Sequence, residues 1–343
     1  MDRLPRQPSA DPETARKISK GTPMTETLTA LILTFNEEKH IERCIRSLDG
    51  IAERVCVIDS YSTDRTVEIA KSLGAEIVQN AWHGHAAQFQ WGLNTLGICS
   101  DWTLRIDADE YLDEELRESM SAWLAAPQST INGVYLRRQI VFLEQPILHG
   151  FFYPLNILRL WRSGEGRMEQ RRMDEHVILK SPNTTVLKGG DLVDHNLNDL
   201  SWWIAKHNTY ATLEMISRVE ARHIKEASEE VLTGQAARKR WLKEQVYARL
   251  PATLRASFYF AYRYVIGRGF LDGKAGFFFH FLQAYWYRTL VEAKYFELQQ
   301  RAKTAGLTPY AMLQKEGVFP SENEAAVYRE GKMEGKNGET APS

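Results

Sequence analysis

Hydrophobic and polar residues alternate early in the chain in a way that predicts a strand followed by a helix. Residues 28–33 form a short, mostly apolar run, which is typical of a strand buried on both faces. A polar stretch follows this run. Apolar residues then return at the spacing of a helix, at Ile41, Cys44, Ile45 and Leu48.

The same pattern recurs further along the chain. Strands are predicted at residues 55–58, 75–78 and 102–106, with helices around residues 67–73 and 88–96. Strands that alternate with helices predict an α/β fold, in which a mostly parallel, Rossmann-like sheet is flanked by helices. In such sheets, ligands bind at the carboxyl ends of the strands.

The pattern changes in the second half of the chain. Longer strands are predicted at residues 134–142 and 156–161, a loop rich in Gly and Arg follows, and the chain beyond Leu200 is mostly helical, with a charged helix around residues 229–247. The two ends of the chain are polar and are predicted to be disordered. The predicted parts are a leader, an α/β domain, a helical C-terminal region and a tail, at residues 1–26, 27–200, 201–319 and 320–343.

Residues 258–298 are dense in aromatic side chains and are interrupted by charged ones. They can form a helical core packed on the sheet. They can also form an interfacial element, with Tyr and Trp at the lipid headgroups and Arg and Lys facing anionic lipid. The run at residues 277–282 is apolar around the whole helix, which indicates burial in protein or in lipid, and of these two we favour membrane contact. The chain has no run of 18 uninterrupted apolar residues, so a simple transmembrane helix is not expected.

Composition and charge exclude some classes of function. The chain has 343 residues, of which 43% are hydrophobic, so it can form a large core. Its net charge is -1, which argues against a protein that binds nucleic acid, since such proteins usually carry a strong basic excess. The three cysteines lack the spacing of a zinc or redox site, which fits a reduced, cytoplasmic compartment.

An acidic cluster directly follows the strand at residues 102–106. Asp107 and Asp109 are two residues apart, so in extended chain their side chains point the same way. Two such carboxylates can hold Mg²⁺ or Mn²⁺, and the ion in turn can bind diphosphate oxygens. The alternative is a solvated acidic turn before the next helix, because this motif is common by itself.

Polar residues also follow the first two strands. Thr34, Asn36 and Glu37 come after the first, and Asp59 comes after the second. A carboxylate at the Asp59 position can accept hydrogen bonds from a base or a ribose, although it could equally cap the helix that follows. Three clusters at one edge of the sheet favour a binding site over three separate caps.

Three motifs carry a resemblance to a known family. In this order and at this spacing they resemble the inverting family 2 glycosyltransferases, which have the GT-A fold, and more closely the branch that contains the lipopolysaccharide core β-1,4-glucosyltransferases. The resemblance is strong over residues 28–200. The motifs are Leu33-Thr34-Phe35-Asn36-Glu37-Glu38, Asp59-Ser60-Tyr61-Ser62-Thr63-Asp64 and Arg105-Ile106-Asp107-Ala108-Asp109-Glu110.

This resemblance implies an enzyme that moves a sugar from a nucleotide diphosphate-sugar, with UDP-sugar as the donor, to a hydroxyl of a glycan or lipid-linked acceptor. It implies a place in lipopolysaccharide or cell-envelope polysaccharide synthesis, at the inner face of the cytoplasmic membrane. It also implies that Thr34, Asn36 and Glu37 line the nucleotide pocket and that Asp59 contacts the base.

The resemblance implies a metal site and a general base as well. Asp107 would approach the ribose and the metal, and Asp109 would bind Mn²⁺ or Mg²⁺ directly. His195 is a candidate for a further metal ligand, although a lone histidine is more often structural. An inverting transferase needs one general base, which the resemblance assigns to Glu175, with Asp174 as supporting partner or alternative. The same pair could instead cap a helix or form surface ion pairs.

Two other functions compete with this one. A sugar-1-phosphate nucleotidyltransferase would carry a Gly-rich loop with a basic residue after the first strand, and residues 34–38 have neither. A non-catalytic protein that binds sugar nucleotides or scaffolds a membrane assembly would not need Asp107, Asp109 and Glu175 together. Transfer or hydrolysis of a donor would separate these possibilities.

Overall fold

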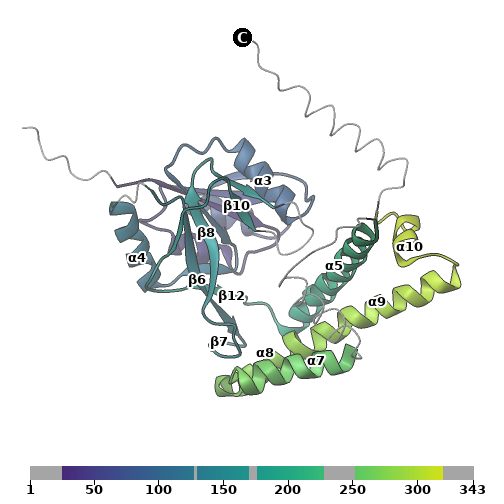
Figure 1. Ribbon diagram of the computed structural model, residues 1–343. Helices are drawn as coiled ribbons and strands as arrows, with labels where there is room; N and C mark the ends of the chain where they lie inside the picture. The colour runs from purple at the N-terminus through teal and green to yellow at the C-terminus, as the bar shows by residue number, and fades with distance from the viewer. Residues whose placement is uncertain (1–24, 127–129, 170–175, 228–251, 320–343) are drawn as a thin grey trace, which may run out of the picture.

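The structure is a computed structural model that describes residues 25–126, 130–169, 176–227 and 252–319. The leader up to residue 24, the tail from residue 320 and the charged helix expected around residues 229–247 lie outside the described residues. The described chain forms a sheet domain and a group of C-terminal helices (Figure 1).

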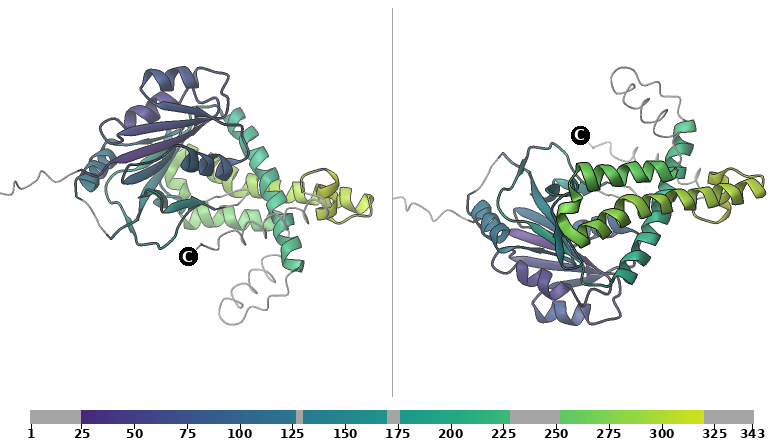
Figure 2. Two further views of the ribbon diagram at one scale, coloured as in Figure 1. Left: turned by 90° about the horizontal axis from the view of Figure 1, so that it is seen from above. Right: turned by 90° about the horizontal axis from the view of Figure 1, so that it is seen from below.

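The first half of the sheet is parallel, as the strand–helix pattern predicts. Its strands lie in the order β3-β2-β1-β4, and all three pairings are parallel. Helices connect the strands and cover the sheet (Figure 2). The strands are β1 (Leu28–Thr34), β2 (Arg54–Asp59), β3 (Glu76–Gln79) and β4 (Trp102–Asp107), and the helices are α1 (Ile41–Ser47), α2 (Thr66–Ser72) and α3 (His85–Thr95).

The second half of the sheet is mixed. The order continues from β4 through β8 (Leu155–Arg162), β6 (Gly133–Phe142) and β12 (Leu192–His195) to β5 (Glu110–Leu112). β8 runs antiparallel to both β4 and β6, whereas β12 runs parallel to β6. The remaining elements of the domain are α4 (Glu114–Ala125), the short strands β7 (Gln145–Ile147) and β11 (Thr184–Val186) beside β6, and the separate pair β9 (Gly166–Met168) and β10 (Val177–Leu179).

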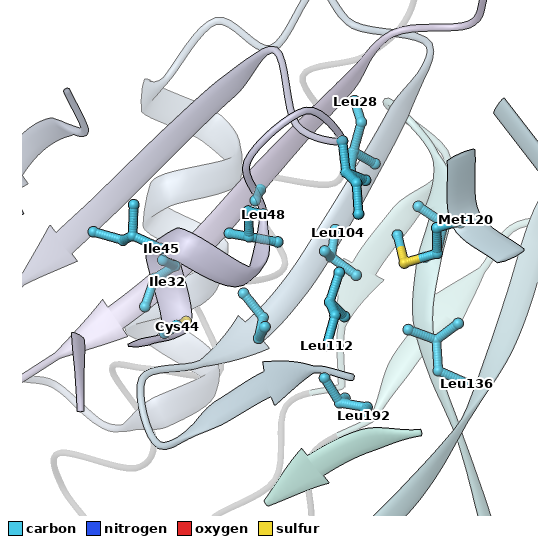
Figure 3. Close-up of a cluster of buried hydrophobic side chains, with 14 of the residues drawn as sticks. Leu28, Ile32, Cys44, Ile45, Leu48, Leu104, Leu112, Met120, Leu136 and Leu192 are labelled. Atoms are coloured by element: carbon cyan, nitrogen blue, oxygen red, sulfur yellow. The ribbon is translucent and has the colours of Figure 1, made fainter. Parts of the chain in front are cut away.

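The central strand β1 is buried on both faces, which explains its unbroken apolar sequence. On one face, Leu28 and Ile32 pack with Cys44 of α1 and with Leu48, which directly follows this helix (Figure 3). On the other face, Leu31 belongs to the cluster that contains Phe89 of α3 and Trp161 of β8. Helices therefore cover both sides of the strand, and its carboxyl end is left for the loops that follow.

The C-terminal region is helical, as predicted. The longest of its described helices, α5, packs against α9 through a cluster that includes Met215 and Val291, and Arg218 pairs with Glu292 at 2.6 Å. Among the residues that the structure describes, no helix combines the length and the apolar character needed to cross a membrane. The elements are α5 (Leu200–Ala227), α7 (Ala252–Ala261), η3 (Tyr262–Ile266), η4 (Gly269–Asp272), α8 (Gly273–His280), η5 (Phe281–Trp286), α9 (Tyr287–Thr304) and α10 (Pro309–Lys315).

The turn between α7 and α8 is joined to the β7 end of the sheet domain. Asp272 accepts hydrogen bonds from the backbone N–H of His149 at 3.0 Å and from that of Leu148 at 3.3 Å. The Gly150 N–H donates to the Gly267 carbonyl at 2.8 Å. The His280 ring is fully buried beside Gly150, where any Cβ would overlap it, so this close approach requires glycine. We call these contacts the glycine–histidine junction.

Candidate active site

The three polar clusters meet at one edge of the sheet. In the pairing of β1 with β2, Thr34 lies opposite Asp59, and in the pairing of β1 with β4, Leu33 lies opposite Asp107. Thr34, Asp59 and Asp107 are the last residues of their strands, so the loops that follow leave the sheet side by side. The structure thus brings together the residues that the sequence predicts for this edge.

Asp59 is fully buried and ties the ends of three strands together. One of its carboxylate oxygens accepts hydrogen bonds from the Thr34 hydroxyl at 3.0 Å and the Ser62 hydroxyl at 2.5 Å. The other accepts from the Ser62 N–H and the Gln79 amide, both at 2.9 Å. A ligand could bond directly to this carboxylate only by exchanging one of these four partners.

The loop after β1 is fastened to the loop after β2. Asn36 has a left-handed backbone with φ 57°, which asparagine tolerates better than most residues. Its side-chain oxygen accepts from the Thr63 N–H at 2.8 Å, and its own N–H donates to the Ser62 hydroxyl at 2.9 Å. The Glu37 N–H donates to the Thr66 hydroxyl at 2.7 Å. The two loops therefore form one preorganised surface.

His40 connects this surface to the start of the helical region. Its Nε2 accepts a hydrogen bond from the Leu197 N–H at 2.8 Å, so the ring proton lies on Nδ1. That Nδ1 donates to the Glu37 carboxylate at 2.7 Å. Lys39 also donates to the Asn198 side chain at 3.0 Å. The segment before α5 is thereby held against the site.

Asp107 is surrounded by cationic and neutral nitrogen atoms. Arg159 donates to it at 2.8 Å, the Arg105 Nε lies 3.5 Å away, and the His85 Nε2 lies 3.9 Å away. Burial by itself would raise the pKa of Asp107, but the charges of Arg159 and Arg105 hold it well below its usual range. The side chain remains 28% exposed. Asp107 is therefore an ionised carboxylate that a ligand can reach.

A buried ionic network supports Asp107 from below. Arg159 also donates to Glu110 at 2.7 Å, and Arg138 lies 3.2 Å from Glu110 and 2.5 Å from Asp194. Burial raises the pKa of the fully enclosed Glu110 to about 7, against the opposing effect of Arg159. The two arginines link β8 and β6 to β12 and to the acidic turn, and so fix the orientation of Asp107.

Asp109 and His195 are neighbours, but their contacts are structural in this state. The His195 N–H donates to the Asp109 carbonyl at 3.1 Å, and the Asp109 carboxylate accepts from Asn196 at 2.9 Å. The His195 Nδ1 accepts from Arg43 at 3.1 Å, so its Nε2 carries the proton and faces Glu144 at 3.2 Å. Both ring nitrogens of His195 are therefore engaged.

Two residues at the site are not identified by the sequence motifs. Burial lowers the pKa of His85 to about 4, so at neutral pH its Nε2 is a neutral acceptor, and it faces Arg105 at 3.3 Å. The Lys206 ammonium lies over the Trp202 ring at 4.6 Å. Burial lowers the pKa of Lys206, but Asp109, Glu37 and other acceptors outweigh this and raise it. Helix α5 thus brings a cation toward the acidic residues of the sheet edge.

The acidic residues suit a metal that shares its ligands with a substrate. Within the described residues, no three His, Cys, Asp or Glu side chains come together so as to hold an ion. Asp107 and Asp109 provide two carboxylates, of which Asp107 is ionised and partly exposed. Mg²⁺ is commonly held by one or two carboxylates, with substrate phosphates and water completing the shell. The donor set therefore fits a metal–diphosphate complex.

The predicted catalytic pair, Asp174 and Glu175, lies outside the described residues. The residues that flank it are joined, since the Glu169 N–H donates to the His176 carbonyl at 2.8 Å. This bond continues the pairing of β9 with β10. The general-base assignment stays a prediction from the resemblance.

Comparison with known proteins identifies the family. The family model described as glycosyl transferase family 2 matches residues 29–183. The lipopolysaccharide core biosynthesis glycosyltransferase LpsC of Rhizobium meliloti is 33% identical over 206 residues, which are 57% of this chain and 72% of LpsC. The matched region contains the three motifs at the sheet edge.

The other matched proteins are covered over a smaller share of their length. An uncharacterized glycosyltransferase of Rickettsia bellii is 43% identical over 134 residues, which are 39% of this chain and 45% of that protein. The crystal structure of glucosyl-3-phosphoglycerate synthase from Mycobacterium tuberculosis with Mn²⁺, UDP and glucosyl-3-phosphoglycerate aligns at 26% identity and a TM-score of 0.27, over 34% of this chain and 44% of that one. On its family model and its match to LpsC, this chain belongs to glycosyltransferase family 2 and has the GT-A fold, with a helical, aromatic-rich C-terminal region.

Proposed function

We propose that this protein is an inverting, metal-dependent glycosyltransferase that transfers a sugar from a UDP-sugar to a hydroxyl of a glycan or lipid-linked acceptor. The observation that carries the proposal is the ionised, partly exposed Asp107, two residues from Asp109, beside the joined loops after β1 and β2. This edge is where parallel α/β sheets bind their ligands.

The nucleotide half of the donor would lie on the loops after β1 and β2. Thr34, Asn36 and Glu37 would line it, and Asp59 would contribute to recognition of the base. Because Asp59 already accepts four hydrogen bonds, direct contact with a base N–H requires one of them to be exchanged. The preorganised loops lower the entropic cost of binding, since few groups remain to be ordered.

The diphosphate half of the donor would face the acidic turn. Asp109 and Asp107 would hold Mn²⁺ or Mg²⁺, with His195 as a ligand only after release from Arg43 and Glu144. When bound, the ion neutralises charge on the diphosphate leaving group. Arg105 and Arg159 keep Asp107 ionised, and Lys206 adds a positive charge from α5.

The acceptor half of the reaction needs a base. Glu175 would take the proton of the acceptor hydroxyl, with Asp174 as its support or its replacement. A single displacement then inverts the anomeric centre. The similarity to LpsC supports an acceptor in lipopolysaccharide or other envelope polysaccharide synthesis, and with it a place at the inner face of the cytoplasmic membrane.

Replacement of Asp109 by Asn tests the proposal. With a panel of UDP-sugars and Mn²⁺, the wild type should show a higher melting temperature, because a ligand that binds only the folded state stabilises it. Asp109→Asn should lose the metal-dependent part of this shift. Its transfer rate should fall at least about a hundredfold, because a metal at such a site contributes several kcal/mol to the transition state.

The exposed Asp49 provides the matched control. Asp49→Asn makes the same chemical change on the surface, and it should leave both the shift and the rate unchanged. Near-normal transfer by Asp109→Asn with a normal melting curve would contradict the metal assignment. Donor binding by the wild type without any transfer or hydrolysis would favour the alternative, a non-catalytic sugar-nucleotide-binding or membrane-assembly scaffold protein.

A further inference from the structure

Exposed hydrophobic side chains gather on the hairpin formed by α7 and α8. In the described chain, ten of the 21 exposed large hydrophobic side chains lie within residues 254–281. This hairpin lies along one edge of the molecule, at the bottom of Figure 1. We define the hairpin surface by its six most prominent members, which are between 48% and 67% exposed: Phe258, Tyr262, Val265, Ile266, Leu271 and Phe278.

The two sides of the hairpin form one continuous surface. Tyr264 of the first arm contacts Phe277 of the second, with ring centroids 5.6 Å apart. Phe260 and Phe281 are 6.1 Å apart in the same way. Six of the ten side chains are aromatic, and aromatic side chains offer on the order of 150–250 Å² each, so at about half exposure these six alone present on the order of 600 Å². Monomeric soluble proteins rarely expose a continuous apolar patch above a few hundred Å².

The surface extends onto the sheet domain through Phe151. Its ring stacks on Tyr262 with centroids 4.9 Å apart, and it remains 56% exposed. Phe151 has φ 61°, a conformation that costs free energy in a bulky residue and that tends to persist at functional sites. The backbone is therefore strained where it presents an aromatic ring to solvent.

The charges around the surface are cationic. Residues 252–281 contain four Arg or Lys residues and a single acid, Asp272. The Asp272 side chain is only 3% exposed, because its carboxylate is turned toward His149 in the junction. Arg268 and Lys274 are exposed beside the apolar residues. The surface thus offers hydrophobic groups and positive charge without an exposed carboxylate.

We propose that the hairpin surface inserts into the interfacial region of an anionic membrane and docks the enzyme there. Amphipathic helices with Phe and Leu on one side and cations beside them bind in this way, and anionic headgroups add to the attraction. A second copy of the chain is a poorer occupant, because two such surfaces would bring the exposed cations Arg268 and Lys274 of both copies together without an exposed carboxylate between them. Membrane binding is inferred from the surface itself. Only the link between this binding and a membrane-bound acceptor rests on the proposed function.

Flotation of the full chain with lipid vesicles tests the inference without donor or acceptor. The wild type should float with vesicles of phosphatidylcholine that contain about 30% phosphatidylglycerol, and less with phosphatidylcholine alone. The double variant Ile266→Ser/Phe278→Ser should weaken binding to both by about tenfold or more. The variant Arg268→Asn/Lys274→Gln should weaken binding only to the anionic vesicles, by roughly tenfold.

These variants have matched controls. Phe296 on α9 is 60% exposed and lies outside the hairpin surface, so Phe296→Ser should bind vesicles as the wild type does. Arg268 has φ 60°, which Asn tolerates, so this change should preserve the turn. Equal melting temperatures would establish that all variants are folded.

Three results would overturn the inference. The wild type could fail to float with either vesicle, or the Ile266→Ser/Phe278→Ser variant could float as well as the wild type. The chain could also sediment as a dimer without lipid that the same variant dissociates, which would make the surface a self-association interface. Flotation measures lipid binding and does not depend on sugar transfer. A negative flotation result would therefore contradict only membrane docking, whereas normal transfer by Asp109→Asn would contradict only the proposed metal site.

Discussion

At the scale of single residues, buried arginines determine the ionisation and the orientation of the carboxylates in the candidate site. Arg159 reaches Asp107 and Glu110 together, and Arg138 reaches Glu110 and Asp194. A carboxylate that is already ionised and oriented has little reorganisation left when a cation and a diphosphate arrive. Removal of either arginine would leave a buried charge unpaired, which typically costs 3–5 kcal/mol. Such variants therefore report on stability as well as on activity.

The general base is the residue whose test is most specific. Glu175→Gln keeps the shape of the side chain but cannot accept the acceptor proton. Donor and metal should still bind, as measured by the thermal shift, while transfer should fall by roughly two to four orders of magnitude. From an α-linked donor, the wild type should form a β-linked product, and NMR of the product can establish this linkage.

Asp174→Asn is the paired control for the base. Neighbouring side chains in extended chain point apart, so only one of the two should reach the acceptor hydroxyl. An inactive Asp174→Asn with an active Glu175→Gln would move the base by one residue and leave the mechanism intact. Full activity in both variants would contradict the assignment of the base to this pair, and an α-linked product would contradict the inverting mechanism.

At the scale of elements, helix α5 connects the two parts of the molecule. Asn196, just before it, holds Asp109, and the Leu197 N–H bonds to His40. Lys206 then lies about two turns into the helix, with its stem across Trp202. A helix that packs on α9 at one end thus supplies a charge to the sheet edge at the other.

Lys206→Met should weaken use of the donor. Met retains the packing of the stem but removes the charge that would meet the diphosphate. A hydrogen bond to a charged group contributes about 1.5–3 kcal/mol, so kcat/KM for the donor should fall by roughly 10- to 100-fold. Lys206→Arg should restore part of the loss. Lys71 of α2 is exposed, so Lys71→Met is the control and should leave the kinetics unchanged. Unchanged kinetics in Lys206→Met would show that Lys206 has only a packing role.

The same elements explain what could be predicted from the sequence. The parallel half of the sheet can be predicted because β1, β2 and β4 are largely buried apolar runs and a helix lies between successive strands. The ends of these strands alone place Thr34, Asp59 and Asp107. β5 and β12 have three and four residues, too few for a periodic pattern. β9 falls within a segment that composition alone assigns to a loop.

The supporting residues of the site are harder to predict. Arg159 lies in the middle of a strand that reads as apolar, and Lys206 lies in a helix with many charged residues. Each meets Asp107 or Asp109 across a long stretch of sequence, so only tertiary packing shows their relation to the site. The apolar composition of residues 277–282 likewise leaves open whether protein or solvent faces each ring.

At the scale of the whole molecule, the junction between the sheet domain and the hairpin should respond to acid. Burial lowers the pKa of His280 to about 4, and its surroundings include Asp272, Arg263 and His149. The unfolded chain would titrate this histidine near its usual value of about 6.5, so between these values it binds more protons than the folded chain. Stability should therefore be complete above about pH 6.5 and should fall as the pH drops towards 4.

His280→Asn measures this contribution. Its free energy of unfolding, from denaturant titrations at several pH values, should be lower at neutral pH because the ring packing is lost. Between about pH 6.5 and 4, the free energy of unfolding of the variant should also fall less than that of the wild type. The two decreases should differ by no more than about 2 kcal/mol after solvent screening. Identical pH dependence in both proteins would contradict the role of His280.

The glycine–histidine junction also fixes the distance between the hairpin and the edge of the sheet that carries the candidate site. Backbone hydrogen bonds and a ring packed against glycine leave the hairpin little freedom to move relative to the sheet edge. If the hairpin rests in the bilayer, the height of the catalytic centre above the lipid is then constant. A lipid-linked acceptor would then be usable only when its hydroxyl reaches that height, and each added sugar would move the new end of the glycan further from the lipid. If the acceptor is lipid-linked, as proposed, the junction would thus favour acceptors of one length.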